Sequence, residues 1–290
     1  MKVLVIGRGG QVARALVRRA PEGVAVETLS RPELDLAALR DADALVAVRR
    51  PDVVINAAAY TAVDAAESDA DAARAVNAQG AEAVAAAAAR LGAPVIQVST
   101  DYVFAGDKGA PYVESDPVGP TGVYGRTKLE GERLVAAANS SAVIVRTAWV
   151  YDAHGKNFVR TMLRLAGQRP ELSVVSDQQG CPTFADDLAD ALFAIARAPK
   201  PGVVHCAGAG ETTWAGFAEA IMALAAERGG PSAKVQPIPT SAYPTPAKRP
   251  ANSRLNCAKL QGEYGVAMRP WRAALADCVD EIAAGGWRVG

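Results

Sequence analysis

A phenol and an ammonium group stand four residues apart in Tyr124-Gly125-Arg126-Thr127-Lys128. Residues with this spacing lie on one face of a helix, so the two groups are expected to meet there. A free tyrosine titrates near pH ~10, and a neighbouring positive charge stabilises its phenolate and makes the phenol a better proton donor at neutral pH. The pair suits acid–base chemistry at a carbonyl group, although the same spacing also occurs by chance on many helices.

A hydroxyl group that can complete this pair lies in Ser99-Thr100-Asp101-Tyr102, directly after an apolar run. The run is typical of a strand, and open α/β sheets bind their ligands at the carboxyl ends of strands. Thr100 can donate a hydrogen bond to a substrate oxygen while Tyr124 supplies the proton. We therefore predict a catalytic set of Thr100, Tyr124 and Lys128.

A glycine-rich turn over residues 7–13 follows the first apolar run and opens a helix-like segment. At such a turn a dinucleotide pyrophosphate can approach bare backbone and a helix N-terminus. Ala13 stands where a third glycine often sits, and a glycine turn can also be purely structural. Its place at the start of an α/β pattern favours cofactor binding. The residues predicted to contact the cofactor here are Gly7, Gly10, Gln11 and Val12.

The end of the second predicted strand, Leu29-Ser30-Arg31-Pro32, distinguishes between two dinucleotides. An acidic residue at this place binds the ribose 2′-hydroxyl of NAD, whereas a basic one accommodates the 2′-phosphate of NADP. Ser30 and Arg31 therefore favour NADPH, with NADH as an alternative, while an ordinary solvated arginine is the competing interpretation. Further residues expected along the cofactor are Asp35 and Leu36 beside the adenine, and Ala57, Ala59 and Tyr60 at the end of the third strand.

Five short β-branched runs in the first half of the chain alternate with longer alanine-rich stretches. Apolar runs without period-2 alternation suit strands covered on both faces, and their alternation with helices is typical of a parallel, doubly wound sheet. We therefore predict an α/β fold of the Rossmann type. The expected strands are residues 2–6, 24–29, 52–57, 94–99 and 142–146, and the clearest helices are residues 11–19, 70–90 and 126–138.

Proline and glycine become frequent after about residue 151, and segments such as residues 243–250 cannot form long helices. Helices are still expected at residues 157–166, 185–197, 214–228 and 271–284. We therefore predict a dinucleotide-binding domain over residues 1–151. Residues 152–290 are expected to form a smaller, mainly substrate-binding C-terminal lobe whose chain can cross back to the sheet.

Charge and cysteine content narrow the classes of partner. The chain has 31 basic and 31 acidic residues, so neither nucleic acid nor a membrane surface is an expected partner. The apolar run at residues 2–6 is too short for a signal-peptide core or a membrane span, and we expect a cytoplasmic protein. The four cysteines are widely spaced, without a Cys-x-x-Cys pair, and predict buried free thiols rather than a zinc site or disulfides.

The glycine turn, the hydroxyl residue at a strand end and Tyr-x-x-x-Lys together resemble the short-chain dehydrogenase/reductase superfamily. Longer segments are similar, more specifically, to the dTDP-4-dehydrorhamnose reductase family. These segments span nearly the whole chain: residues 10–12, 56–64, 99–104, 123–128, 146–151, 177–183 and 243–255. The later motifs are specific to that family rather than to reductases in general.

This resemblance implies NADPH-dependent reduction of the 4-keto group of a dTDP-sugar, dTDP-4-dehydro-6-deoxy-L-mannose, to dTDP-L-rhamnose. Tyr124 would donate the proton, Lys128 would tune Tyr124 and hold the nicotinamide ribose, and Thr100 would orient the keto oxygen. Asp101 and Trp149, like Thr100, match positions that contact the deoxysugar in the family. A sugar face stacking on the Trp149 indole is expected, with ordinary core packing of the indole as the alternative.

The resemblance also bears on the diphosphate and on a metal. Lys248 and Arg249 are candidates for binding the nucleotide diphosphate, with plain surface charge as the alternative. Some relatives bridge two subunits with a metal held by acidic side chains, one of them on the first helix, where this chain has Ala15. Asp186 and Glu281 lie near the other expected positions. We predict no bound metal, and a monomer or a homodimer.

Two other functions stay open. A sugar-nucleotide epimerase or 4,6-dehydratase would share the Rossmann half and Tyr-x-x-x-Lys. A dehydratase, however, needs an acid and a base beside the threonine, and here Asp101 is followed by Tyr102 rather than glutamate. A non-catalytic, nucleotide-binding regulatory subunit would have the same fold, and the intact set of Thr100, Tyr124 and Lys128 argues against it.

Overall fold

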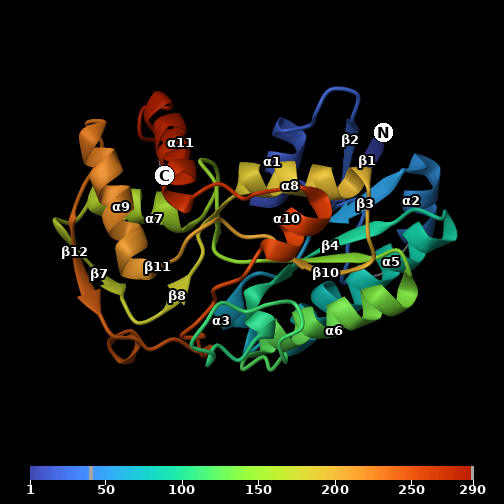
Figure 1. The fold of residues 1–290 in the computed structure, drawn as a ribbon, viewed down its shortest axis with the longest axis horizontal. Helices are drawn as coiled ribbons and strands as arrows, with labels where there is room; N and C mark the ends of the chain where they lie inside the picture. Colours follow the sequence, from blue (N-terminus) through green and yellow to red (C-terminus); the bar gives the residue numbers. More distant parts are fainter. Residues whose placement is uncertain (39–41, 289–290) are drawn as a thin grey trace.

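A six-stranded parallel sheet forms the centre of the computed structural model, which describes residues 1–38 and 42–288 (Figure 1). Its strand order is β10-β5-β4-β3-β1-β2. The order reverses beside β1, because β2 lies on one side of it and β3 on the other, and open α/β sheets bind ligands at such a reversal. The strands are β1 (Lys2–Ile6), β2 (Ala25–Leu29), β3 (Val53–Asn56), β4 (Val95–Thr100), β5 (Val143–Thr147) and β10 (Gly202–His205).

Helices cover both faces of this sheet, which confirms the predicted Rossmann-type architecture. One face carries α1 (Gln11–Arg18), α8 (Ala185–Arg197) and α10 (Ala258–Tyr264). The other carries α2 (Ala42–Arg49), α5 (Ala81–Arg90) and α6 (Val123–Ala138). Because α5 buries mainly alanine side chains, it can approach the sheet closely. The first five strands and α1 all begin and end within one residue of the predicted bounds.

Two helices differ from the prediction for reasons that are not local. Helix α6 begins at Val123, three residues early, because Glu67 accepts a hydrogen bond from the Val123 amide at 2.8 Å and so caps the helix from a distant segment. The predicted helix over residues 70–90 consists of α4 (Ala70–Arg74), a π-helical turn (Ala75–Gly80) and α5. A short helix, α3 (Val63–Ala66), precedes them.

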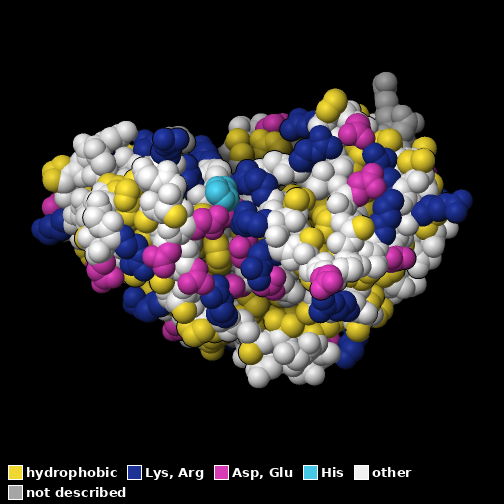
Figure 2. Space-filling model, turned by 90° about the horizontal axis from the view of Figure 1, so that it is seen from above, with side chains coloured by type: hydrophobic (Ala, Val, Ile, Leu, Met, Phe, Trp, Pro, Cys, Tyr) yellow, Lys and Arg dark blue, Asp and Glu magenta, His cyan; other side chains and the backbone are white. Residues whose placement is uncertain are grey.

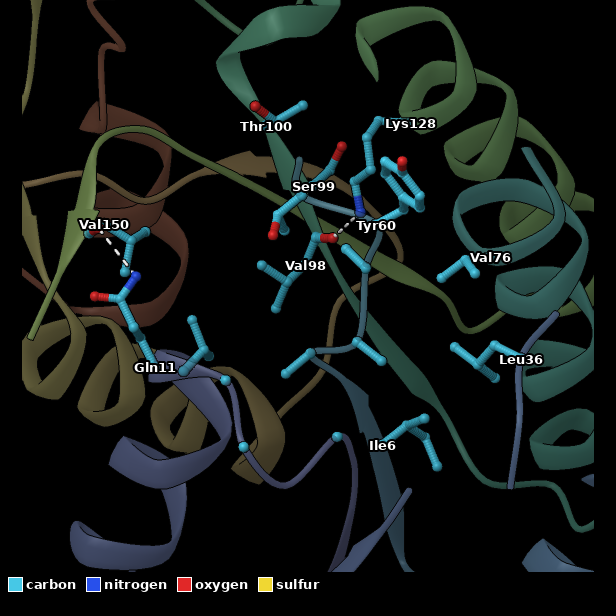
Figure 3. A pocket seen from close by; sticks show the side chains of 18 of the residues that line it. Ile6, Gln11, Leu36, Tyr60, Val76, Val98, Ser99, Thr100, Lys128 and Val150 are labelled. Atoms are coloured by element: carbon cyan, nitrogen blue, oxygen red, sulfur yellow. Dashed lines mark hydrogen bonds between the residues drawn. The ribbon is translucent and has the colours of Figure 1, made fainter. Parts of the chain in front are cut away.

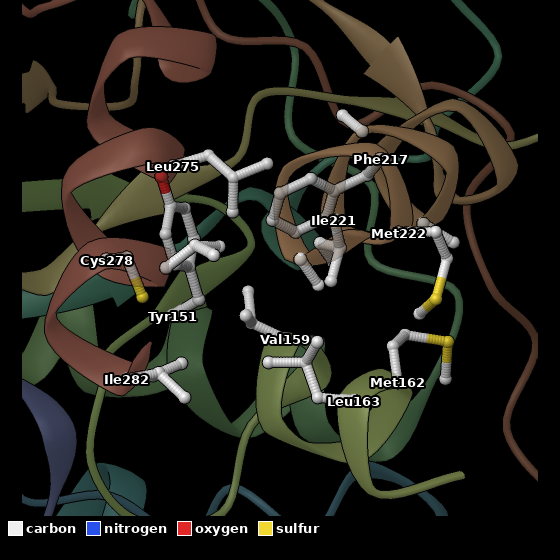
Figure 4. Close-up of a cluster of buried hydrophobic side chains, with 14 of the residues drawn as sticks. Tyr151, Val159, Met162, Leu163, Phe217, Ile221, Met222, Leu275, Cys278 and Ile282 are labelled. Atoms are coloured by element: carbon white, nitrogen blue, oxygen red, sulfur yellow. The ribbon is translucent and has the colours of Figure 1, made fainter. Parts of the chain in front are cut away.

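The second lobe packs three helices against short strand pairs, and Figure 1 shows it beside the sheet. Its core is continuous and aromatic-rich, with Tyr151 and Phe217 among the fully buried side chains (Figure 4). The helices are α7 (Phe158–Ala166), α9 (Trp214–Glu227) and α11 (Trp271–Ala284). The strands are β6 (Val150–Tyr151), β7 (Glu171–Val175), β8 (Gln179–Gly180), β9 (Thr183–Phe184), β11 (Thr212–Thr213) and β12 (Lys234–Ile238), and 3-10 turns lie at Asp101–Val103 and Thr240–Ala242.

The chain crosses back to the sheet after residue 151. Strand β10 pairs in parallel with β5, and α8 packs on the same face as α1. The α8 and α11 helices have the predicted bounds, while α7 begins one residue late and α9 ends one residue early. No helix within the described residues combines the length and the apolar character needed to cross a membrane.

The distribution of surface charge and the state of the cysteines agree with what the sequence indicated, except at one cysteine. Basic and acidic side chains intermingle on the face seen in Figure 2, and neither sign gathers into an extended patch. All four cysteines are free. Cys181, Cys206 and Cys278 are buried, whereas Cys257, directly before α10, is only partly buried and packs against the edge of the core beneath that helix.

Candidate active site

One cavity of about 1260 Å³ runs along the carboxyl ends of the central strands to the second lobe (Figure 3). Its size exceeds that of an ordinary single-ligand pocket, so it has room for a dinucleotide and a second ligand. The predicted site residues that line it are Gly7, Gly10, Gln11, Val12, Ser30, Arg31, Asp35, Leu36, Ala57, Ala59, Tyr60, Thr100, Asp101, Tyr124, Lys128 and Trp149. The predicted residues outside its wall are Lys248 and Arg249.

The glycine turn leaves a helix end open to the cavity. Gly7 has a φ of 117° and donates its amide to the Leu29 carbonyl at 2.8 Å, which holds the turn against β2 in a conformation that favours glycine. Gly9 and Gly10 face open space, and α1 has neither a side-chain cap nor an acidic residue in its first turn. The first amides of α1 are therefore available to an anion such as a pyrophosphate.

The loop after β2 forms an exposed mouth of the cavity. Ser30 donates its hydroxyl to the Arg31 carbonyl at 3.2 Å, and the Arg31 side chain is exposed. A second arginine, Arg8, lies at the same mouth and bonds Thr28 at 3.2 Å and Glu33 at 3.4 Å. Two guanidinium groups thus lie at the end of β2, the part of a Rossmann-type fold that distinguishes NAD from NADP.

At the opposite end, Lys128 is buried and its ammonium donates to the Val98 carbonyl at 2.7 Å (Figure 3). Burial lowers the pKa of Lys128 to about 8, and the Glu132 carboxylate opposes that change. Burial raises the pKa of Tyr124 to about 12, the nearby Thr100 hydroxyl opposes that change, and the Asp101 charge adds to it. The expected lowering of the Tyr124 pKa by Lys128 is not found, because the ammonium is directed at a main-chain carbonyl.

Thr100 and Asp101 form a bonded pair at the end of β4. The Thr100 hydroxyl donates to an Asp101 carboxylate oxygen at 3.0 Å and accepts the Tyr102 amide at 3.2 Å. Burial raises the pKa of Asp101 to about 6, and the neighbouring Ser253 and Thr100 hydroxyls oppose that rise. The Tyr102 ring meets the Tyr124 ring edge-on, with centroids 5.5 Å apart. This end of the cavity therefore holds hydroxyl and carboxyl groups in a fixed arrangement.

The Trp149 indole is held between two partners. Trp214, from the start of α9, stacks on it with ring centroids 3.5 Å apart and planes 9° apart. The Gly180 backbone packs against the ring as well, since a Cβ there would stand 2.2 Å from Cε2 and 2.6 Å from both Cζ2 and Nε1. Those distances place Gly180 above the ring, so both indole faces are covered. A sugar would meet the ring edge, which corrects the face-stacking expected from the sequence.

Trp149 also has an unusual backbone conformation. Its φ is 48°, in the left-handed region that a bulky residue rarely adopts. Strain of this kind persists where the surrounding structure enforces it, and it is concentrated at functional sites. Here the Trp214 stack and the Thr183 amide, which donates to the Trp149 carbonyl at 3.1 Å, hold the residue in place.

The two basic residues of the Pro-rich segment lie beside the cavity rather than along it. Lys248 is exposed. Arg249 donates to the Asp64 carboxylate at 2.7 Å, and the same carboxylate accepts the Ala247 amide at 3.2 Å. The loop is thereby anchored to the segment that follows β3. The Arg249 charge still lowers the pKa of Tyr102, which lines the same end of the cavity as Thr100.

The acidic residues considered for a metal have other partners. Asp186 binds the Arg18 guanidinium, and Glu281 binds His154 at 2.8 Å. Ala15 is buried and has no donor atom. Across residues 1–38 and 42–288, no group of three or more His, Cys, Asp or Glu side chains is placed to hold a metal ion. Both carboxylates are therefore engaged within this chain, and Ala15 offers no ligand at the third position.

Comparisons with known proteins agree with this geometry. Residues 1–284 match the family described as the RmlD substrate binding domain. A dTDP-4-dehydrorhamnose reductase from Sinorhizobium fredii is 49% identical over 278 residues, covering 93% of this chain and 94% of the relative.

The chain belongs to the dTDP-4-dehydrorhamnose reductase family.

Two solved structures of dTDP-4-dehydrorhamnose reductases superpose closely on this family member, each with a TM-score of 0.92 and each covering 97% of this chain and 99% of the other. One, from Clostridium acetobutylicum, is 40% identical, and the other, from Bacillus anthracis and in complex with NADP, is 33% identical. The match extends over both lobes, as the motifs of the sequence indicated.

Several cavity residues of this reductase-family chain escaped the sequence analysis. Arg8 sits inside the glycine turn, and its charge there was a usable signal. Trp214 and Lys156 come from the second lobe, where nothing in the local sequence relates them to Tyr124. The Val98 contact is a main-chain carbonyl, which no side-chain pattern can indicate.

Proposed function

We propose that this chain reduces the 4-keto group of dTDP-4-dehydro-6-deoxy-L-mannose, using NADPH, to give dTDP-L-rhamnose. The observation that carries the proposal is a single cavity in which Thr100, Tyr124 and Lys128 lie at one end and the open glycine turn lies along the other. Family membership supports the same reaction, since the reported relatives carry that activity in their names. The NADP complex of a relative supports the choice of cofactor.

The proton in this reaction comes from Tyr124. Because burial holds the pKa of Tyr124 at about 12, the phenol keeps its proton at neutral pH and is ready to give it to the keto oxygen. NADPH bound along the glycine turn would supply the hydride to the sugar C4. The Thr100 hydroxyl would turn from Asp101 and donate its hydrogen bond to the same oxygen instead, which favours the negative charge that develops there. The Lys128 ammonium would hold the nicotinamide ribose and balance the phenolate that Tyr124 leaves behind.

We assign the remaining substrate contacts from where the side chains lie in or beside the cavity. Asp101 can accept hydroxyl donors of the sugar, since its pKa of about 6 leaves it mostly ionised at neutral pH. The Trp149 edge borders the same space. We assign the diphosphate to Arg249, which would exchange Asp64 for a phosphate, with Lys248 close by. Residues 1–151 would hold the cofactor, and residues 152–290 would mainly hold the sugar nucleotide.

The competing functions predict different products. An epimerase or dehydratase would return its cofactor unchanged after each turnover, and a regulatory subunit would turn over neither ligand. The Tyr102 ring occupies the position after Asp101 where a dehydratase needs an acid, which favours the reductase.

The test incubates the purified protein with NADPH and the dTDP-keto sugar, and follows both cofactor oxidation and the sugar product. We expect one NADPH oxidised for each dTDP-L-rhamnose formed. Product formation without net NADPH loss would reject the reductase assignment in favour of an epimerase or dehydratase. We further propose a cytoplasmic monomer or homodimer, to be measured by light scattering after size-exclusion chromatography.

A further inference from the structure

A buried ion pair lies directly behind the catalytic residues. Arg146 donates to both oxygens of the Glu132 carboxylate, from Nε at 2.9 Å and from Nη2 at 2.7 Å, and each side chain is only 5% exposed. The Ser99 hydroxyl donates to the same carboxylate at 2.6 Å. A buried pair of this kind rarely adds net stability over apolar packing, so stability alone does not explain why it is here.

The carboxylate joins three elements that carry the proposed chemistry. Glu132 lies one helical turn after Lys128 on α6, so the two side chains share a face. Ser99 is the neighbour of Thr100 on β4. Arg146 lies on β5, which leads directly to Trp149. A shift of one carboxylate would therefore displace the proton donor, the hydroxyl donor and the sugar-facing indole relative to one another.

The surroundings of Glu132 contain few other charges. The Arg146 guanidinium lies over the Phe104 ring, 5.1 Å from its centroid, and His205 meets the same ring edge-on at 5.6 Å. Burial lowers the pKa of His205 well below its usual value, so the imidazole is neutral near pH 7. Glu114 accepts the His205 amide at 2.8 Å.

We infer that Glu132 is a positioning residue: it fixes Ser99 and Arg146 from α6 and places its negative charge one turn from the Lys128 ammonium. The inference rests on the proposed function for what Lys128 does. Arg146 pairs directly with this buried carboxylate, whose charge also opposes the lowering of the Lys128 pKa. Without the anion, Arg146 would repel the Lys128 ammonium, and burial would deprotonate Lys128 at a lower pH.

Two substitutions of Glu132 separate the effect of its charge from the effect of its side-chain length. Glu132→Gln removes the charge and keeps the length, whereas Glu132→Asp keeps the charge but is one methylene too short to hold Ser99 and Arg146 together. For Glu132→Gln we expect kcat to fall about ten-fold or more and the alkaline limb of the pH profile to move to lower pH by about half a unit or more. For Glu132→Asp we expect a similar fall in kcat with the alkaline limb unmoved.

The matched control is Glu130→Gln on the same helix. Glu130 pairs with Arg74 at the surface, and both side chains are partly exposed, so this change should leave kcat and the pH profile as in the wild type. A Glu132→Gln protein with the wild-type kcat and pH limb would overturn the inference. So would equal pH shifts for the Gln and Asp variants, because the charge would then not be the cause.

NADPH affinity, measured by fluorescence at several pH values, supplies a readout that needs no sugar substrate. The loss of affinity at alkaline pH should begin at a lower pH in Glu132→Gln than in the wild type. If the wild type binds NADPH with this dependence but does not reduce the sugar, the proposed function fails and the positioning role stands.

A second variant, Ser99→Ala, tests the positioning role even if Glu132→Gln does not fold, because it removes one hydrogen bond to Glu132 and keeps the ion pair with Arg146. We expect kcat of Ser99→Ala to fall about three-fold or more, and an unchanged kcat would refute the linkage.

Discussion

The two ends of the cavity are built in opposite ways. At the catalytic end, Thr100 and Lys128 are buried and each is bonded to a fixed partner, Asp101 and the Val98 carbonyl. At the adenosine end, Ser30 and Arg31 lie on an open loop, and Arg31 is exposed. Under the proposed function, one cavity places the reacting groups rigidly and leaves cofactor recognition to groups in contact with water.

The two ends of the cavity should also differ in the strength of their electrostatic interactions. Charges in a buried, low-dielectric site interact strongly and depend on geometry, whereas exposed charges are screened by water and salt. Substitutions at the catalytic end should therefore change rates by large factors that salt does not alter. Substitutions at the adenosine end should give smaller effects that weaken as salt is added.

The largest effect is expected from Tyr124→Phe, which removes the proton donor and leaves the ring packed against Tyr102. Turnover should fall by roughly 10²-fold or more with NADPH affinity little changed. Steady-state kinetics and fluorescence binding measure the two quantities. Tyr264→Phe is the control, because Tyr264 bonds Lys200 on the far side of the sheet and should not affect turnover. Near-normal turnover of Tyr124→Phe would remove the basis for the catalytic set.

A smaller but double effect is expected from Lys128→Met. Turnover should fall about ten-fold or more, and NADPH should bind several-fold more weakly, because one ammonium is proposed to act on both the phenol and the ribose. Lys259→Met is a matched control, since Lys259 also donates to a strand carbonyl, that of Val203 at 2.6 Å, but lies outside the cavity. A loss of turnover with unchanged NADPH affinity would show that Lys128 does not touch the ribose.

The smallest effect is expected from Arg31→Ala at the open end. A charge-assisted contact to the 2′-phosphate is worth about 1.5–3 kcal/mol when well formed and less at an exposed site. The KM for NADPH should rise about ten-fold, that for NADH should stay nearly constant, and the difference should shrink with added salt. Arg90→Ala is the control at a surface ion pair outside the cavity. Equal changes for both cofactors would show that Arg31 does not read the phosphate.

The sequence predicted the sheet and the clustering of the catalytic set well, for a clear reason. Buried parallel strands are continuous apolar runs, and residues at their carboxyl ends converge at one edge of the sheet. Thr100 and Gly7 could therefore be brought together without coordinates.

What was missed depends on long-range contacts. Glu67 caps α6 from 56 residues away in the chain. Asn77 sits in a π-helical turn, where its amide group binds the Tyr60 main chain and the Thr127 hydroxyl. Two-residue strands such as β8 carry no periodic signal at all. The covering of both Trp149 faces depends on Gly180 and Trp214, which lie in two other segments of the chain.

The chain returns to the central sheet after residue 151. The molecule therefore cannot be cut into two folded halves at that residue, although the amino-acid composition changes there. A fragment ending at residue 151 would lack β10 and α8. It would then present the unpaired edge of β5 and the apolar face that Leu188, Leu192 and Phe193 normally cover. Exposed edges and apolar faces of this kind promote aggregation. Limited proteolysis should therefore yield no stable N-terminal half, and the enzyme should be made, trimmed or fused only as a whole.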